Sequence, residues 1–436
     1  MADCPGVHKL ALTRDGALAR IRLPGGSLTA SQLQTIAALA AKEGNGCIDL
    51  TNRANLQIRG LSEHRAAVIA SQLAEADLLC LDASADRLRN ITASPLSGLD
   101  TTALLNVREL IPAIDAAIST FPQHDAVSVK FSIVLGDGGR SPMTTVAHDL
   151  AFHPEKHGGR TLIRLWLAGQ ATNVLIAAKD VSPSITRALS MMLKHGATRI
   201  KELIKQVPRK ACADAIAGPL AIAVDPSPHL GERPWLPLGR TPDQRAVVLG
   251  VPLARFSPDQ LESLAEIMEA RGIGDVRLTP WQSLVLPVTH HSSAKNVETE
   301  LASAGFDIEC PEVHVVACAG STGCLRTTMD TKHDAAMLRS HLAKHSTNMH
   351  RADKEMPIVH LSGCARSCAM TSPADVLALA NDGTNARESD STTYALYVDA
   401  RPASLQDIGP IRASVRPSEL TSTISALSYT SGETIR

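Results

Sequence analysis

The chain has 436 residues, of which 44% are hydrophobic and 20% are charged, and its formal net charge is −1. This length predicts two or three domains, and the near-zero charge gives no support for binding to nucleic acid or to a membrane surface. Because no run approaches the roughly 18 apolar residues of a spanning helix and no signal region opens the chain, we expect a cytoplasmic protein.

Residues 1–79, segment A, show a β-α-β-β pattern. A strand at Ala19–Leu23 is followed by Thr29-Ala-Ser-Gln32, a capping box that opens a helix. Apolar residues at helical spacing predict the buried face of this helix, which stops at the glycines of 44–46. Alternating residues then predict two strands, at 48–51 and 56–58.

Residues 80–217, segment B, have mixed α/β character. We predict a long strand at Val127–Leu135, a turn at Gly136–Gly139, a strand at Leu162–Leu167 and a helix at Ile185–Leu193. The proline-rich stretch from Gly218 to Pro237 predicts a linker.

The pattern of segment A returns at an offset of 228 residues. Without a gap, Leu18–Ile58 aligns with Ala246–Leu286, and a second capping box at Ser257-Pro-Asp-Gln260 has proline in the favoured first turn. Chance would not preserve caps, helix face, glycine stops and strand parity together. We therefore define segment A′ as residues 218–306 and expect A and A′ to pair about a pseudo-twofold axis.

Residues 307–436, segment B′, repeat the mixed α/β character. Strands are predicted at 313–317, 358–361, 376–380 and 394–398, with a helix around 335–342 and a turn at 381–383. The order of segments is therefore A, B, A′, B′, and we expect B to be a relative of B′ that carries no cluster.

Four cysteines of segment B′ form two close pairs, Cys318-Ala-Gly-Ser-Thr-Gly-Cys324 and Cys364-Ala-Arg-Ser-Cys368. Each pair follows a predicted strand on a Gly/Ser-rich loop, which favours four thiolates that bind one [4Fe–4S] cluster. A zinc site is the alternative, but structural zinc sites usually place two to four residues between paired cysteines, and the gaps here are five and three. Nine cysteines, an odd number, do not indicate a disulfide framework.

These motifs resemble the nitrite/sulfite reductase superfamily over the whole A-B-A′-B′ order. Within it, Asp49-Leu-Thr-Asn-Arg-Ala-Asn-Leu-Gln57, Ser94-Pro-Leu-Ser-Gly-Leu-Asp100 and His360-Leu-Ser-Gly-Cys-Ala-Arg-Ser-Cys-Ala369 resemble the precorrin-3B synthases of the aerobic cobalamin pathway. The resemblance implies an α+β fold with two ferredoxin-like half-domains and two mixed α/β domains, the C-terminal one carrying the cluster.

The resemblance also assigns site residues. In the sirohaem reductases the last cluster cysteine, here Cys368, bridges to the haem iron. An arginine that contacts the anionic substrate corresponds to Arg53, and an Arg-Asn pair corresponds to Arg89-Asn90. Of two lysines spaced by one residue, the first corresponds to Lys130, but the second position is Ser132. The chain therefore departs from the dense set of cations that stabilises a small oxyanion during reduction.

A precorrin-3B synthase hydroxylates precorrin-3A with O₂ and external electrons and closes a lactone. The resemblance then implies that Arg53, Arg89 and Lys130 act in catalysis and pair with substrate carboxylates, with Asn55, Gln57 and Asn90 as further polar contacts. Two alternatives stay open: a sirohaem-dependent nitrite or sulfite reductase, and a non-catalytic iron–sulfur electron carrier.

A mononuclear non-haem iron that activates O₂ is also implied, and the sequence does not locate its ligands. The candidates are five histidines: His148, His153, His157, His314 and His360. No Gly-x-Gly-x-x-Gly motif follows a strand, so we expect a separate ferredoxin or flavoprotein as electron donor. Trp281 takes the place of Arg53 in A′ and is expected to serve packing.

Overall fold

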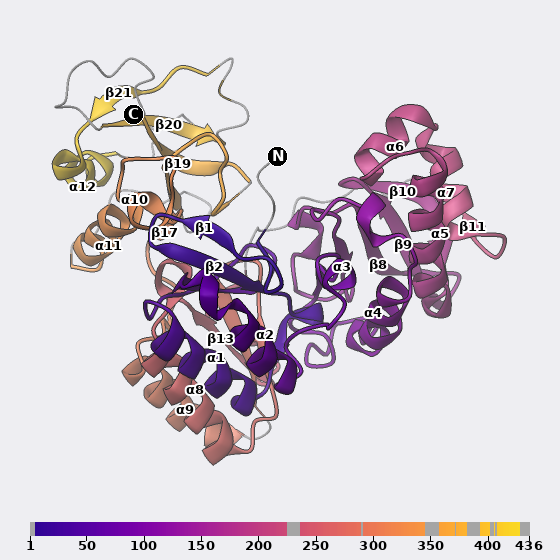
Figure 1. Ribbon diagram of the computed structural model, residues 1–436, viewed down its shortest axis with the longest axis horizontal. Coiled ribbons are helices and arrows are strands. Elements are labelled where there is room, and N and C mark those ends of the chain that lie inside the picture. The colour runs from indigo at the N-terminus through magenta and orange to yellow at the C-terminus, as the bar shows by residue number, and fades with distance from the viewer. Residues whose placement is uncertain are drawn as a thin grey trace. The chain divides into compact units, whose positions relative to one another are not determined.

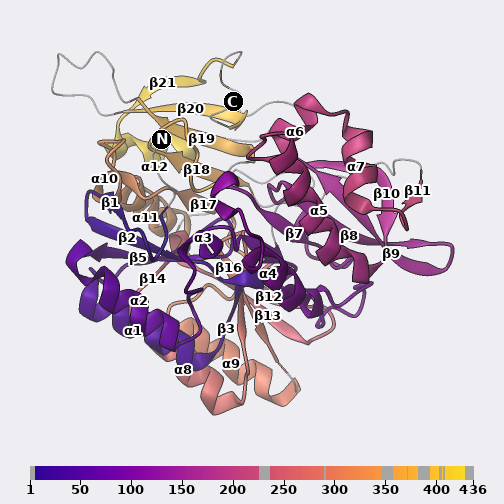
Figure 2. The same ribbon diagram turned by 45° about the vertical axis from the view of Figure 1, so that its right-hand side comes forward.

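The computed structural model describes residues 5–224, 236–288, 291–344, 357–370, 372–381, 393–401, 405 and 408–427 (Figures 1 and 2). The chain divides into two compact units. Unit 1 comprises Met1–Ala11, Ala17–Val251 and Phe256–Ile308, and unit 2 comprises Leu12–Gly16, Pro252–Arg255 and Glu309–Arg436. Segments A, B and A′ thus lie almost entirely in unit 1 and B′ in unit 2, while the predicted boundaries within unit 1 stay a prediction.

Segment A forms the predicted β-α-β-β unit. Its sheet has the order β1-β2-β5-β4-β14, with β1 at Ala11–Thr13, β2 at Gly16–Ile21, β4 at Ile48–Leu50 and β5 at Leu56–Leu61. Helix α1, Ala30–Glu43, begins with the predicted capping box between Thr29 and Gln32, and its apolar face is buried. A second helix, α2, spans Ala66–Glu75.

Segment A′ repeats this unit. Its sheet has the order β12-β13-β16-β15-β3, with β12 at Gly239–Arg240, β13 at Ala246–Gly250, β15 at Val276–Leu278 and β16 at Ser283–Pro287. Helix α8, Pro258–Arg271, has the second predicted capping box, and α9 spans His291–Ser303. Helices α1 and α8 lie side by side in both views.

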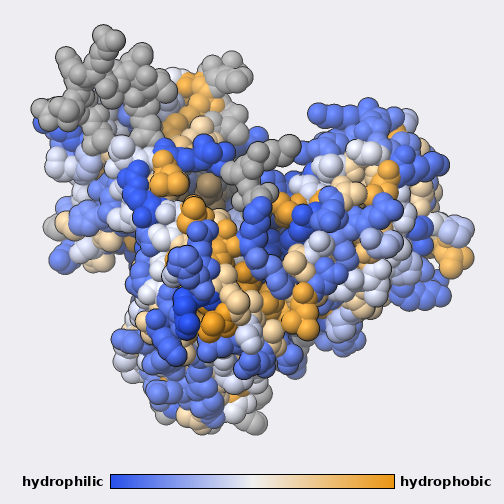
Figure 3. Space-filling model, in the orientation of Figure 1, coloured by the Kyte–Doolittle hydropathy of each residue, from blue (hydrophilic) through white to orange (hydrophobic). Residues whose placement is uncertain are grey.

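The two half-domains exchange short strands. Strand β3, Ser27–Leu28, comes from segment A but pairs with β15 of A′, with Leu28 opposite Val276. Conversely, β14, Arg255–Phe256, follows the corresponding turn of A′ and is the last strand of the A sheet. This reciprocal exchange confirms the expected pseudo-twofold pairing. The surface around α1 and α8 is mainly hydrophilic (Figure 3), because each of these two helices buries one face only.

Segment B is a six-stranded sheet of order β11-β10-β9-β8-β7-β6. Its strands are β6 Ile91–Ala93, β7 Ile133–Leu135, β8 Leu150–His157, β9 Arg160–Leu167, β10 Gln170–Ile176 and β11 Ile222–Ala223. Helices α4 Ile111–Ser119, α5 Val181–Lys194, α6 Ile200–Gln206 and α7 Arg209–Ala217 pack on one face, and α3 is the short turn Ala83–Asp86. Of the predicted linker, β11 is a strand, and residues 225–235 lie outside the described residues.

The long strand predicted at 127–135 is wrong, since only Ile133–Leu135 is a strand. Val127 and Phe131 are buried, but the backbone between them turns and leaves Lys130 exposed. The side-chain amide of Asn90 donates to Val129 O at 3.3 Å and to Phe131 O at 3.1 Å, in place of a neighbouring strand. An irregular loop that buries two of its side chains therefore has the same apolar and polar pattern in the sequence as a strand.

Segment B′ has the same topology as B. Its sheet runs β17-β18-β19-β20-β21, at His314–Ala317, Ile358–Ser362, Ala374–Ala380, Tyr394–Ala400 and Arg412–Val415. In both sheets the first two pairings are parallel and the next two are antiparallel. Helices α11 Thr331–Leu342 and α12 Pro417–Ser425 cover one face of this sheet. Most of the predicted turn at 381–383 lies outside the described residues.

Backbone hydrogen bonds fix the correspondence between B and B′. Ser94 N donates to Leu135 O at 2.8 Å, and Cys318 N donates to Leu361 O at 3.2 Å, each just after the first strand of its sheet. Ser94 and Cys318 are therefore equivalent, at an offset of 224 residues. The predicted relationship of B to B′ is confirmed.

At two corresponding positions the copies differ in side-chain size in opposite directions: where one copy has the smaller residue at the first position, it has the larger residue at the second. The turn Pro24–Gly26 of A corresponds to Pro252–Ala254 of A′, and Ile111 of B corresponds to Ala335 of B′. A Cβ atom at Gly25 would lie 2.3 Å from Ile111 Cδ1, so the first copy needs glycine there. In the second copy Leu253 packs against the core that contains Ala335.

None of the helices in the described part of the chain is long and apolar enough to span a membrane.

Candidate functional site

The four cysteines of B′ lie close to one another on two loops. Cys318 directly follows β17 and Cys324 follows the one-turn helix α10, Gly320–Gly323, while Cys364 and Cys368 follow β18. Partial removal of the Cys368 thiol from water and the three other thiols raise its pKa, although the residue as a whole is exposed. That influence requires the four sulfurs to be close. Cys368 is the exposed member, and the other three are half-buried.

Backbone N–H groups lie next to two of the four sulfur atoms. Gly363 N donates to Cys318 Sγ at 3.2 Å, and Arg326 N lies 3.5 Å from Cys324 Sγ. The hydroxyl of Thr331 lies 3.3 Å from Cys318 Sγ and donates to Cys318 O at 3.0 Å. Donors of this kind stabilise the negative charge of cluster sulfurs and tune the cluster's potential.

The loops suit an iron–sulfur cluster better than a single ion. A Cβ atom at Gly363 would lie 2.6 Å from Thr327 Cγ2, so the second loop needs glycine to approach the first. Within the described residues, no three His, Cys, Asp or Glu side chains are arranged to hold one metal ion. In a [4Fe–4S] cluster each thiolate binds a different iron, so the thiolates gather without closing around one centre. The four cysteines fit this group.

Segment B fills the equivalent place with polar side chains. Ser94 and Asp100 correspond to Cys318 and Cys324, with the same spacing. Ser94 Oγ lies 2.7 Å from the carboxylate of Asp137 and 2.8 Å from the hydroxyl of Ser141, and Asp100 forms a 2.7 Å ion pair with Arg140. At these two positions B has no thiol to bind a cluster, and the side chains there are bonded to other polar groups. Sequence reasoning missed this network, although the equal spacing was a signal for it.

Two candidate histidines lie in the sheet of B′. His360 is fully buried on the interior strand β18, and neither ring nitrogen has a hydrogen-bond partner among the described residues. Burial lowers the pKa of His360 to about 4. Burial and the nearby charge of Arg339 lower the pKa of His314 to about 4 as well. Both imidazoles are therefore neutral at pH 7.

The other three candidate histidines lie in B. His148 Nδ1 is 2.8 Å from Val146 O, and burial lowers the pKa of this side chain. His153 packs against Trp166 with ring centroids 5.0 Å apart, and His157 is exposed at the end of β8. None of the five histidines belongs to a three-ligand metal site within the described residues, so the ligands of a second iron stay a proposal.

The structure brings Arg53 and Lys130 together. Arg53 lies in the tight turn between β4 and β5, next to Ala54 in the left-handed region at φ 54°. Arg53 Nη2 donates to Lys130 O at 3.4 Å, and Thr92 Oγ1 lies 3.5 Å from Arg53 O. The side chain of Arg53 is half-buried and that of Lys130 is exposed, so both remain accessible to a ligand.

Arg89 is committed to an acidic partner. Its guanidinium makes a fork with Asp115, in which both N–O distances are 2.8 Å, and a longer 3.8 Å contact with Asp86. Burial disfavours the charged form of Arg89, but the hydrogen bonds and charge of Asp115 outweigh this, so the pKa of Arg89 is raised. A substrate anion would have to compete with Asp115 for this cation.

The three predicted amide contacts serve the protein in different ways. Asn90 supports the loop of Lys130 through Val129 O and Phe131 O, as described above. Gln57, with its amide oxygen turned to Arg20, accepts from Arg20 at 3.0 and 2.7 Å. Asn55 Oδ1 accepts from Leu23 N at 2.9 Å, but its buried Nδ2 has no partner among the described residues. The buried amide nitrogen of Asn55 is therefore unsatisfied among the described residues.

Where the reductases have the second of their two lysines, this chain has the uncharged Ser132. Ser132 is buried, and its backbone N–H donates to Asp149 at 3.1 Å. Asp149 is in turn paired with Arg199 at 2.7 Å. No cation replaces the lysine at this position.

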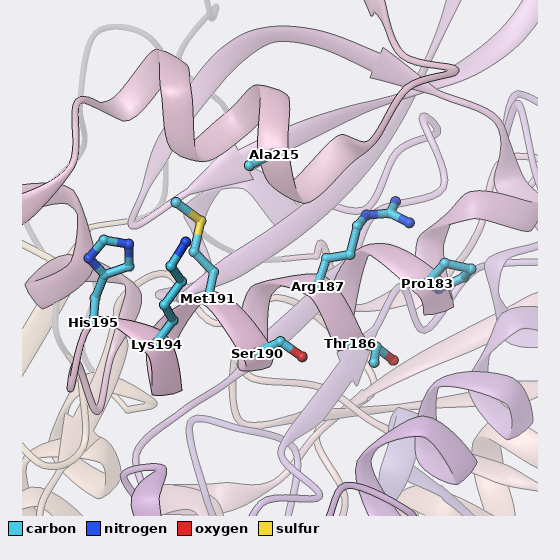
Figure 4. Close-up of a pocket in the computed structure, with 8 residues that line it drawn as sticks. All are labelled: Pro183, Thr186, Arg187, Ser190, Met191, Lys194, His195 and Ala215. Carbon is cyan, nitrogen blue, oxygen red and sulfur yellow. The ribbon is translucent and has the colours of Figure 1, made fainter.

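Two cavities are of interest. One, of about 390 Å³, lies in unit 2 beside the first cysteine loop, and Pro252, Leu253, Arg255, Thr322, Asp330, Lys332 and His333 line it. The other, of about 610 Å³, lies in B between α5 and α7 (Figure 4). In the latter, Arg187 donates to Ile216 O and Ala217 O, each at 2.7 Å. Its guanidinium therefore caps carbonyl groups at the C-terminal end of α7.

Two protein-family models match the chain. The ferredoxin-like half domain of nitrite/sulfite reductases matches residues 12–76 and 238–304, which are the two β-α-β-β units. The nitrite and sulphite reductase 4Fe-4S domain matches residues 84–207. That range contains no cysteine, and it lies within segment B. The five strands of B′ have the same order and directions as the first five strands of B.

Several known proteins resemble the chain over most of its length. A ferredoxin–nitrite reductase of Synechococcus elongatus is 27% identical over 412 residues, 85% of this chain and 77% of the relative. A precorrin-3B synthase of a Sinorhizobium species is 27% identical over 385 residues, 86% of this chain and 79% of the relative. The structure of the Mycobacterium tuberculosis NirA protein superposes with a TM-score of 0.74 at 18% identity, covering 94% of this chain and 79% of that protein. The last likeness confirms the predicted fold class.

Proposed function

Since this chain belongs to the nitrite/sulfite reductase superfamily, we propose that it is an oxidoreductase that converts precorrin-3A to precorrin-3B. One atom of O₂ enters the tetrapyrrole as a tertiary hydroxyl, and a ring acetate closes a lactone. The other oxygen atom leaves as water, which consumes two electrons and two protons from outside. The four cysteines would hold the cluster, which would supply the electrons one at a time. Activation of O₂ would require a second iron, for which the described residues offer no three-ligand site.

The observation that carries this choice is the reduced set of cations. Reduction of nitrite or sulfite calls for several cations around one small anion. Here Arg89 is neutralised by Asp115, and Ser132 stands in place of a lysine. Arg53 and Lys130 lie on two different loops that contact each other, and two such cations can pair with two different carboxylates of a tetrapyrrole.

In this proposal each site residue has a defined task. Arg53 and Lys130 bind carboxylates of the substrate, and Asn55 Nδ2 donates a hydrogen bond to it. Arg89 and Asn90 act indirectly: the fork of Arg89 with Asp115 secures the start of segment B, and Asn90 positions the loop of Lys130. Gln57 is held by Arg20, its partner on the neighbouring strand β2.

A second candidate function is a sirohaem-dependent nitrite reductase, which the equal identity to the Synechococcus enzyme favours. The absorption spectrum of the anaerobically purified holoprotein separates the two. The proposal predicts a broad cluster shoulder alone. A sirohaem Soret band together with an α band would overturn it.

A holoprotein that has an intact cluster but does not convert the tetrapyrrole would instead favour the third alternative, an iron–sulfur electron carrier. The proposal also requires an external donor, which we expect to be a ferredoxin or a flavoprotein. Turnover by the purified chain with NADH alone would contradict this part of the proposal.

A further inference from the structure

The second cysteine loop of B′ has a counterpart in segment B. Leu135 O and Leu361 O accept the equivalent backbone hydrogen bonds described above, so the residues that follow them correspond at an offset of 226 residues. The loop Gly-Asp-Gly-Gly-Arg-Ser-Pro of B therefore aligns with Ser-Gly-Cys-Ala-Arg-Ser-Cys of B′. Both cysteines are replaced in B, but the arginine between them is retained, as Arg140 in B and Arg366 in B′.

Arg140 holds a carboxylate at the place of a cluster ligand. Its backbone N–H donates to Asp100 at 2.6 Å, and its guanidinium donates to the same carboxylate at 2.7 Å. Asp100, whose side chain is fully buried, corresponds to Cys324. A longer contact of 3.2 Å joins Arg140 to Asp243. In segment B this arginine thus neutralises the negative charge that lies where B′ has a thiolate.

Segment B′ lacks such carboxylate partners for Arg366. Cys324 stands in place of Asp100. Asp15 stands at the position of Asp243, at the offset of 228 residues, but its carboxylate accepts from a threonine hydroxyl at 2.7 Å. The side chain of Arg366 is exposed, and it forms no ion pair or hydrogen bond with the part of the chain that the structure describes.

The loop presents Arg366 beside a cluster ligand. Ser367 is buried and has φ 52°, and its hydroxyl donates to Met370 O. Residues in this strained region persist where the surroundings fix them. Arg366 and Cys368, on either side of this fixed residue, are both exposed. The guanidinium of Arg366 is close enough for its charge to act on the thiol of Cys368. The anion on which Arg366 acts is therefore a cluster ligand.

We propose that Arg366 compensates the charge of the cluster and thereby raises its reduction potential. Four thiolates make the site negative, and reduction adds one electron while no bond or proton changes at Arg366. A nearby cation favours the reduced state, because its attraction grows with the added negative charge. Arginine suits this task because it stays protonated. The inference goes beyond the proposed function, since it concerns the cluster and not the substrate.

Removal and retention of this charge test the proposal. An anaerobic redox titration of the holoprotein without tetrapyrrole, followed by electron paramagnetic resonance of the reduced cluster, measures the midpoint potential. Arg366→Gln removes the charge, and Arg366→Lys keeps it. The matched control is Arg326→Gln, because Arg326 is also exposed and follows Cys324 by two residues. Its counterpart in segment B is Thr102, so the comparison of the copies assigns no such task to Arg326.

We expect reduction of the cluster to become about tenfold less favourable in Arg366→Gln, which lowers the potential by about 59 mV for one electron. Arg366→Lys should keep most of the parent potential, and Arg326→Gln should shift it by less than half as much as Arg366→Gln. An unchanged potential in Arg366→Gln, or an equal shift in Arg366→Lys or in Arg326→Gln, would overturn the proposal. Weaker binding of precorrin-3A by Arg366→Gln at an unchanged potential would also overturn it, and would assign Arg366 to a substrate carboxylate.

A titratable side chain keeps the proposal testable if Arg366→Gln assembles no cluster. Histidine loses its charge around pH 6.5, whereas arginine does not titrate in the working range. The potential of Arg366→His should therefore approach that of the parent at about pH 5.5 and lie below it by the tenfold equivalent at about pH 8.5. A difference from the parent that is the same at both pH values would overturn the proposal, because a structural role of Arg366 would not depend on this charge.

Discussion

The contrast between Arg53 and Arg89 gives a sharp test of the site, because sequence reasoning treats them alike and the structure does not. Arg53→Ala removes a half-buried guanidinium next to the loop of Lys130. A charge-assisted hydrogen bond contributes about 1.5–3 kcal/mol. We therefore expect Kd for precorrin-3A to rise by about one to two powers of ten, with little change in the free energy of unfolding.

Arg89→Ala should have the opposite profile. It breaks a two-bond fork whose side chains are only 14% and 23% exposed. Asp115 can still reach water, so we expect a loss of about 1.5–3 kcal/mol of unfolding free energy rather than the full penalty of a stranded buried charge. Binding of precorrin-3A by the folded protein should change less than about threefold, because Asp115 already neutralises Arg89 in the parent.

Anaerobic titration with precorrin-3A measures Kd, and denaturant unfolding of the same preparations measures stability. Asp115→Ala and the double variant complete a cycle in which the coupling between Arg89 and Asp115 should appear in stability and not in binding. Equal losses of affinity in Arg53→Ala and Arg89→Ala would refute the reasoning. So would unchanged affinity in Arg53→Ala.

Three further outcomes follow from the structure. Cys368→Ser should abolish the cluster and the activity together, and turnover that survives the loss of cluster absorption would contradict this. Leu253→Gly should destabilise unit 2 by about 1 kcal/mol, since the lost burial of leucine and the entropy of glycine exceed the relief of strain. Adding Ala335→Ile should restore part of this unfolding free energy, as measured with denaturant. A further loss in the double variant would show that the two positions do not compensate for each other in size. His360 has a folded pKa of about 4, below the unfolded value of about 6.5, so its contribution is complete above pH 6.5 and decreases towards pH 4. Between pH 7 and 5 the parent should therefore lose up to about 2 kcal/mol more stability than His360→Val, and parallel curves would show that His360 is not buried as a neutral group.

Local patterns in the sequence predicted the elements that local chemistry determines. The capping boxes at Thr29 and Ser257, the glycine stops and the strand parity needed no tertiary information, and the 228-residue repeat made them more secure. The spacing of the cysteines within each pair likewise predicted the cluster ligands. The pairing of A with A′ followed from the repeat itself.

Long-range contacts were not visible in the sequence. Nothing near Arg89 indicates that Asp115, 26 residues away, neutralises it. The exchange of β3 and β14 between the half-domains depends on two-residue strands that carry no periodicity. The segment before Ile133 alternated for a different reason, since Val127 and Phe131 are buried from a loop that Asn90 holds. In each case a distant partner decided the role of a residue.

Turnover under ¹⁸O₂ tests the central claim most directly. The anaerobically purified holoprotein is mixed with precorrin-3A, reduced ferredoxin and ¹⁸O₂, and mass spectrometry follows the tetrapyrrole. The account predicts a product that has gained one oxygen atom, which carries the label, with two electrons consumed for each O₂. An unlabelled or unchanged tetrapyrrole, in a preparation whose cluster is intact and reduced by the ferredoxin, would contradict it.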